Sequence, residues 1–352
     1  MGRTRWLSVT AGAAAVVLAQ SFSVAADTNP QPVDFTHNVT NAPAPAPNTA
    51  FDMPTTPAAA GVAICTTTTS SAANVSTDCN DNGTAGPHNE TSIAVNPTNP
   101  LNLIGGVNDY QLTLNPDGHL SESILSRAHV SFDGGKTWSM YGVFSSSTYQ
   151  ATGDAALAFD ATGHAYYGTL GFRFVGPFNA QNPDVLVSNS GNGGKSWSEV
   201  VVAHGSGVET AVGDLLDKEY VTAWGAGNAI VTFGDFQLGK GGSVIRSFIL
   251  ASVTHDFGAH WTAPAVISGS DNEAFVSTPT RTANGRILVS YLNTRDVATG
   301  RDDVRVVEVN PESGAPVAGP FTVQQDIIDG AKDYPFDVDG RQTYQDSQFR
   351  TW

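Results

Sequence analysis

The sequence predicts an all-β protein built from repeated units of four strands, and three observations carry this prediction. One short turn motif occurs three times, at intervals of 59 and 64 residues. Short apolar runs of strand length alternate with turns rich in Gly, Asn, Asp and Pro. No stretch beyond the N-terminal segment keeps the 3.6-residue apolar period of an amphipathic helix.

Residues 1–26 are predicted to be a signal peptide. Arg3 and Arg5 precede the apolar run Leu7–Leu18, and small residues at Ser23–Ala26 provide a cleavage site. The two arginines are not adjacent, so general secretion is expected rather than the twin-arginine route. No later run of 18 apolar residues could span a bilayer. We therefore expect a secreted protein without a membrane span.

Residues 27–61 are rich in Pro, Ala and Thr and are predicted to be a flexible linker. The segment 62–87 contains the only two cysteines, Cys65 and Cys79. In an oxidising compartment such a pair is most simply a disulfide that closes a local loop. Two thiols do not complete a metal coordination shell, so no metal site is expected there.

The remainder, 88–352, contains four units that each begin with two strands joined by a turn. The four turns are Asn96–Pro100, Asp160–Gly163, Gly225–Asn228 and Ala283–Gly285. A third strand follows each pair and, in the first three units, leads into the recurring motif. The fourth unit has the strand Val304–Val309 and a turn at Asn310–Gly314 but lacks the motif. Four strands per unit, repeated radially, is the arrangement of a β-propeller blade.

The recurring motif is [S/T]-x-[D/N]-x-G-x-x-W. Its acid or amide can accept backbone hydrogen bonds in a tight turn, its glycine tolerates positive φ, and its tryptophan needs a buried position. The matching residues are Ser131, Asp133, Gly135 and Trp138; Ser190, Asn192, Gly194 and Trp197; and Thr254, Asp256, Gly258 and Trp261.

This motif resembles the Asp box of the bacterial neuraminidase repeat families, whose best-known members are the sialidases. The resemblance implies a six-bladed propeller in which the boxes are structural hairpins, remote from any catalytic centre. Asn192 departs from the usual Asp but can form the same local bonds. At about 60 residues per blade, the chain contains about four to five blades. We expect a propeller that is incomplete at its C-terminus; a smaller propeller with unusual closure is the alternative.

The resemblance also implies exo-glycosidase chemistry. In sialidases a Tyr nucleophile is activated by a Glu, an Asp is the acid/base, and three Arg hold the substrate carboxylate. The Arg-Ile-Pro motif of the family is absent, because no Arg lies between Arg5 and Arg127. Two hypotheses therefore stay open: a secreted, sialidase-type exo-glycosidase directed at extracellular glycans, and a non-catalytic propeller that binds extracellular glycan or protein.

Composition restricts the partners. The net charge of −16 opposes binding to nucleic acid and to anionic membrane surfaces. No cofactor is expected; Asp333, Asp337 and Asp339 either bind a structural calcium ion or form a polar turn. The full-length protein is expected to be a monomer.

We expect the functional site at the end of the blades opposite the boxes. The residues just before each first strand and just after each second strand converge there, and their separations of 19, 19 and 18 residues recur. Crowded carboxylates at such a rim would have raised pKa values, and an arginine could hold an anionic group. The rim positions are Glu90, Asn108, Asp109, Tyr110, Asp154, Arg173, Asp217, Lys218, Glu219, Asp235, Glu273, Asn293, Arg295 and Asp296.

Among these residues, the candidate catalytic set is Asp109, Asp154, Glu219 and Arg173. The candidate ligand-binding set is Tyr110, Asp235, Glu273 and Arg295, together with Tyr291 of the fourth unit.

Overall fold

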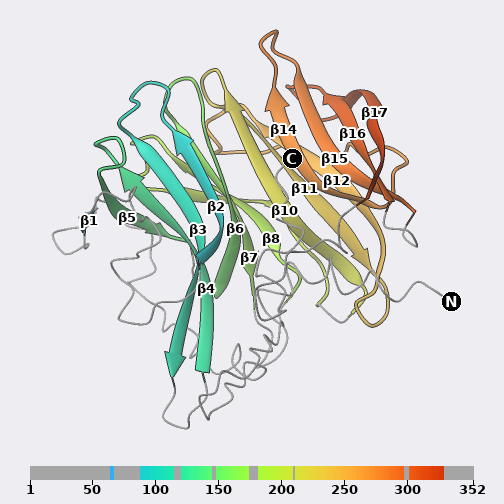
Figure 1. The fold of residues 1–352 in the computed structure, drawn as a ribbon, viewed down its shortest axis with the longest axis horizontal. Helices are drawn as coiled ribbons and strands as arrows, with labels where there is room; N and C mark the ends of the chain where they lie inside the picture. Colours follow the sequence, from blue (N-terminus) through green and yellow to red (C-terminus); the bar gives the residue numbers. More distant parts are fainter. Residues whose placement is uncertain are drawn as a thin grey trace.

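The structure is a computed structural model that describes residues 64–66, 88–114, 120–144, 148–173, 181–208, 211–296 and 301–328. The predicted signal peptide, the linker, Cys79 and the Asp333–Asp339 segment lie outside these ranges. Throughout the described ranges every regular element is a β-strand, and no helix that could cross a membrane is found in them. The strands form four antiparallel sheets, which stand side by side in chain order in Figure 1.

Each sheet is one blade, and its strands follow the order of the chain. The first blade contains β1 (Ile64–Thr66), β2 (His88–Val95), β3 (Leu103–Leu114), β4 (Leu120–Ser131) and β5 (Thr137–Val143). The second contains β6 (Ala151–Phe159), β7 (Ala165–Phe172), β8 (Asp184–Ser190) and β9 (Ser198–Ala203). The third contains β10 (Gly213–Trp224), β11 (Asn228–Leu238), β12 (Val244–Thr254) and β13 (Ala265–Val266). The fourth contains β14 (Ala274–Arg281), β15 (Ile287–Asp296), β16 (Arg301–Val309) and β17 (Pro316–Ile328).

The first full-length strands of the blades, β2, β6, β10 and β14, contact one another in sequence and lie nearest the common axis. The remaining strands of each blade run outward from this inner strand by hairpin pairing. Strand β1 pairs with β5 at the outer edge of the first blade. Part of the predicted 62–87 segment therefore belongs to that sheet. Apart from the added edge strand β1, each sheet has four antiparallel strands, and these sheets define the fold as an all-β propeller of four-stranded blades.

The hydrophobic core lies between adjacent blades rather than within one sheet. Gly106 and Gly168 show how closely the sheets approach. A Cβ atom at Gly106 would lie 2.8 Å from the Tyr167 hydroxyl, and one at Gly168 would lie 2.9 Å from a Val221 methyl group. The three inter-blade clusters include Ile104, Val130 and Tyr167; Val187, Val221 and Val231; and Ile249, Val253 and Val289.

The three motif turns share one hydrogen-bond pattern. In the first, the Ser131 hydroxyl donates to Asp133 (2.8 Å), and the Gly135 N–H donates to Ser131 Oγ (2.8 Å). The Thr137 N–H then donates to Asp133 Oδ1 at 2.9 Å. The equivalent bonds of the second and third turns run through Ser190, Asn192, Gly194 and Ser196, and through Thr254, Asp256, Gly258 and His260. Asn192 thus accepts the same local bonds as the aspartates.

The motif tryptophans contribute to the packing of the blades. Trp138 and Trp197 are buried, with 4% and 6% of their surface exposed, and Trp261 is half-buried. The first motif turn also touches the Asn96–Pro100 end of its blade, because the Gly134 N–H donates to the Leu101 carbonyl. Motif turns and inner hairpin turns therefore lie at the same end of the blades.

Candidate functional site

A β-bulge occurs at one equivalent position in the inner strand of every blade. At each bulge one non-glycine residue has a left-handed backbone: Glu90 (φ 51°), Asp154 (61°), Lys218 (54°) and Val276 (48°). A left-handed conformation costs energy for any residue with a Cβ and is rare in β-branched residues such as valine. The bulges direct side chains from neighbouring blades toward the same place near the axis.

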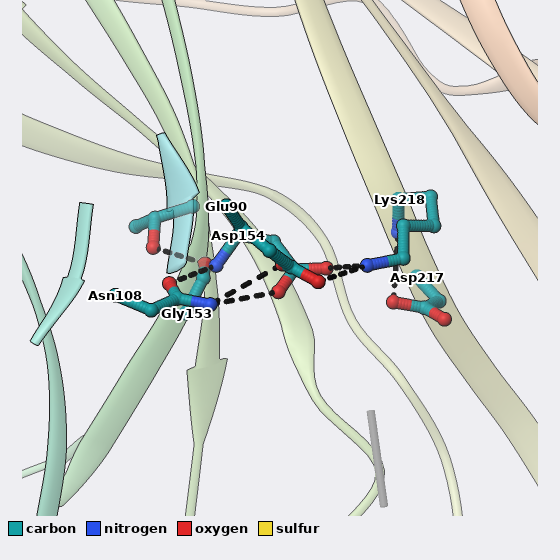
Figure 2. A network of polar contacts seen from close by, with 7 residues as sticks. Glu90, Asn108, Gly153, Asp154, Asp217 and Lys218 are labelled. Atoms are coloured by element: carbon teal, nitrogen blue, oxygen red, sulfur yellow. Dashed lines mark hydrogen bonds and ion pairs between the residues drawn. The ribbon is translucent and has the colours of Figure 1, made fainter. Parts of the chain in front are cut away.

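Lys218 joins the inner strands of the first three blades. Its ammonium group contacts a Glu90 oxygen at 2.9 Å and an Asp154 oxygen at 2.8 Å. Figure 2 shows these side chains pointing toward one another from separate strands. The three charged residues at the equivalent bulges therefore form one ion network.

Asn108 of β3 completes the contact between the first two blades. Its amide donates to Glu90 (3.2 Å) and to Asp154 (3.5 Å), and its carbonyl oxygen accepts the Asp154 N–H at 2.7 Å. The last bond fixes the strained backbone of Asp154 directly. Asn108 is fully buried, so these bonds replace those it would make to water.

Two further carboxyl groups lie beside this network on β10. Asp217 is buried and accepts the Lys218 N–H at 2.9 Å. Glu219 is 2% exposed, and no other residue of the described ranges donates a hydrogen bond to its carboxyl oxygens. Glu90, Asn108, Asp154, Asp217, Lys218 and Glu219 are called the axial cluster below.

The environment separates the pKa values of Glu90 and Asp154. Burial and the neighbouring Asp154 charge raise the pKa of Glu90 well above its usual range, against the opposing effect of Lys218. Burial acts in the same direction on Asp154, but Lys218, Glu90 and Asn108 together hold its pKa below the usual range. The two shifts are opposite in direction, so Glu90 keeps its proton to a higher pH than Asp154 does, which is the division of roles that acid/base chemistry needs.

The other titratable groups of the axial cluster are shifted as well. Burial raises the pKa of Asp217 to about 7, with Lys218 opposing and Asp154 assisting. Burial and the Asp154 charge raise the pKa of Glu219 well above its usual range. Burial disfavours the charged form of Lys218, but Asp154, Glu90 and Asp217 outweigh it and raise its pKa.

The axial cluster reaches solvent at one edge. The side chains of Glu90, Lys218 and Asp154 are 14%, 10% and 6% exposed. Tyr220 lies two residues beyond Lys218 and is 37% exposed. Burial raises the pKa of its phenol, and the charges of Lys218, Asp154 and Glu90 also influence this pKa. A ligand that approaches this edge would meet an aromatic ring beside carboxyl groups, a combination suited to sugars.

Asp109 and Arg173 of the predicted catalytic set lie in other networks. Asp109 follows Asn108 on β3, so its side chain points to the opposite face of the sheet, where it forms a buried ion pair with Arg127. Arg173 contacts the fully buried Asp184 at 3.2 Å. Asp184 also accepts bonds from the Tyr149 hydroxyl (2.7 Å) and His204 Nδ1 (3.0 Å). Only Asp154 and Glu219 of that set belong to the axial cluster.

The predicted ligand-binding residues are dispersed. Tyr291 is buried and donates to Asp271 at 2.7 Å, where Arg305 also binds. Asp235 is half-buried beside Gln237, and burial raises its pKa. The Glu273 carbonyl accepts the Thr294 N–H. For Tyr110 and Arg295 the structure describes the backbone alone.

Glu90, Asp154 and Lys218 follow one another at intervals of 64 residues. This spacing indicates that Lys218 occupies the position in its blade that Glu90 and Asp154 occupy in theirs. The rim positions include Lys218, Asn108 and Glu90, but no role was assigned to them from the sequence. Tyr220 carries no sequence signal of its own, because tyrosine is an ordinary residue in a β-strand. Within the described ranges no three His, Cys, Asp or Glu side chains are grouped so as to hold a metal ion.

No protein-family model and no curated protein matches the chain. Solved structures with similar folds include a protein of unknown function from Dyadobacter fermentans (11% identity, 66% of this chain and 68% of that chain, TM-score 0.45). Others are the Hadza microbial sialidase Hz136 (13%, 70% and 48%, TM-score 0.43) and a Penicillium chrysogenum α-L-arabinanase complexed with arabinobiose (14%, 68% and 65%, TM-score 0.43).

Proposed function

We propose that the protein is a secreted propeller directed at extracellular glycans and that it is an exo-glycosidase whose acid/base pair is Glu90 and Asp154. The observation that carries the proposal is the contact of both carboxyl groups with one lysine, combined with their opposite pKa shifts. The left-handed backbone at both residues adds support, because such strain is concentrated at functional sites.

The proposed reaction is a retaining hydrolysis. Both oxygens lie within 2.9 Å of the same nitrogen, so they are closer than the roughly 6.5–9.5 Å of inverting pairs. Glu90 gives its proton to the leaving-group oxygen while an Asp154 oxygen bonds to the anomeric carbon and the glycosidic C–O bond breaks. Glu90, now a carboxylate, takes a proton from the water that releases the sugar from Asp154. Lys218 positions both carboxyl groups.

Sialidase-type activity is the finer prediction, and it comes from the motif resemblance. Sialosides therefore belong in a panel of fluorogenic glycosides offered to the purified chain. Glu90→Gln and Asp154→Asn are each expected to reduce hydrolysis at least 100-fold, measured at a temperature at which circular dichroism shows that each variant is folded. Lys240→Gln, an exposed turn residue, is the matched control and should retain activity. Unchanged hydrolysis in both carboxyl variants would exclude this pair.

The alternative function is a non-catalytic propeller that binds extracellular glycan or protein at the same edge. One observation favours it: the charges of Glu90, Asp154 and Lys218 already satisfy one another without a ligand. Binding of a glycan without any turnover, weakened by Tyr220→Ala, would support this alternative over hydrolysis.

A further inference from the structure

We infer that the axial cluster accepts an uncharged or amino sugar and rejects sugars that carry a carboxylate or sulfate. This inference rests on the proposed function and narrows it to a substrate class. It depends on which charges at the axis are already paired.

The axial cluster contains four carboxyl groups and one cation. Lys218 uses two of its three N–H bonds on Glu90 and Asp154. Asp154 remains ionised beside it, so the lysine charge is cancelled within the cluster. Ionisation of Glu90, Asp217 or Glu219 can only make the total more negative. An acidic sugar therefore finds no net positive charge here.

Glu219 strengthens this conclusion independently. Its carboxyl group is buried close enough to Asp154 for the two charges to interact, and no other residue of the described ranges donates a hydrogen bond to it. A ligand amine or hydroxyl that reached it would supply a missing donor. A ligand carboxylate would place two acceptors against each other.

Arg127, Arg173 and Arg305 are also paired with aspartates. Arg127 binds the buried Asp109, and Arg173 binds the buried Asp184. In the fourth blade Arg305 makes two bonds to Asp271, at 2.9 and 3.0 Å. The Arg305–Asp271 pair is bidentate, the strong form of such a pair. Each of the three arginines would have to share its charge with its aspartate, or leave that aspartate, in order to bind a substrate carboxylate.

The test is a glycan array probed with the labelled full chain, on which glycans with the same core occur in neutral, amino, sialylated and sulfated forms. Binding to the acidic forms is expected to be at least tenfold weaker than to their neutral counterparts. The difference should shrink as sodium chloride is raised from about 0.05 to 0.5 M, because salt screens charge repulsion. Preference for sialylated or sulfated forms overturns the inference and leaves glycan recognition intact. Absence of binding to every glycan overturns both proposals.

Asp154→Asn provides the matched variant, since it removes one negative charge and preserves shape. Its binding ratio of acidic to neutral glycans should rise at least fivefold, whether or not the protein hydrolyses them. Glu312→Gln removes the same charge at the opposite end of the blades, where its side chain is 80% exposed, and should leave the ratio unchanged. Equal ratios in both variants overturn the inference.

Discussion

Lys218 connects the charges of the first three blades, because its ammonium group bonds to Glu90 and Asp154 from the inner strand of the third. Removing it leaves two neighbouring carboxyl groups without their shared cation. We expect Lys218→Met to lower the free energy of unfolding by about 3–5 kcal/mol, the usual cost of breaking a buried ion pair from one side. Urea unfolding at pH 7 measures this loss. The exposed Lys240→Met is the control, and a loss below about 1 kcal/mol for Lys218→Met would contradict the prediction.

Asp217 makes stability depend on pH. Its pKa is raised from 3.8 to about 7, so the folded protein keeps a proton that the unfolded chain has already released in this interval. Folding is therefore weakened as pH rises from about 4 to about 7. Asp217→Asn removes this effect. From pH 5 to pH 8, the free energy of unfolding of the variant should therefore rise by roughly 2 kcal/mol relative to that of wild type.

Asp133→Asn is the matched control for this measurement. The pKa of Asp133 is lowered to about 2, chiefly by hydrogen bonds from the Thr137 hydroxyl and N–H, so Asp133 does not titrate between pH 5 and pH 8. The stability difference between Asp133→Asn and wild type should stay constant over that range. A constant difference for Asp217→Asn as well would refute the assignment.

At the residue scale, the position of the axial cluster was more predictable from the sequence than the contacts within it. Asp154 and Glu219 of the predicted rim both belong to the axial cluster. Asn108 and Asp109 were predicted at the same rim, but neighbouring residues on a strand point to opposite faces, and only Asn108 joins the axial cluster. Which of two adjacent polar residues faces the axis depends on the register across the bulge, and local composition does not encode that register.

Among the elements, the motif hairpins depend on their tryptophans. Trp138 and Trp197 are buried, and Trp138 also donates to the Gly135 carbonyl within its own turn. Trp138→Ala and Trp197→Ala should each cost roughly 3–5 kcal/mol of unfolding free energy, because a large cavity replaces the ring. Trp261 is half-buried, so Trp261→Ala should cost less. Urea denaturation of the three variants compares these costs, and equal losses at all three sites would contradict the burial order.

The strand pairs, their turns and the third strands were predictable from apolar runs and turn residues. The ends of the inner strands were not. Glu90 is predicted to lie just before the first strand of its unit, but β2 begins at His88 and continues through the bulge at Glu90. A left-handed Glu, Asp or Lys in a strand contradicts its own propensity, so sequence preference places a break where the sheet continues.

For the whole molecule, the exposed face of β2 has a consequence for solubility. Ile93 and Val95 are 61% and 51% exposed, whereas the equivalent Leu157 and Val221 pack on the preceding blade. Exposed apolar strand faces favour association. We expect Ile93→Thr/Val95→Thr to reduce self-association of the chain in sedimentation velocity at concentrations near 1 mg/ml.

Ile245→Thr, which changes an equally exposed isoleucine on β12, is the control and should have a smaller effect. A wild-type chain that stays monomeric over the whole concentration range would argue against this role of the β2 face.

The bulges place four unlike side chains, those of Glu90, Asp154, Lys218 and Val276, on the same backbone conformation. The main chain at these positions therefore does not depend on the identity of the residue it presents. Chemistry at the axis can change by single substitutions without rebuilding the scaffold. A combinatorial library varied at these four positions alone would sample many binding specificities on one framework, and gene duplication of a blade followed by drift at one codon would do the same over evolutionary time.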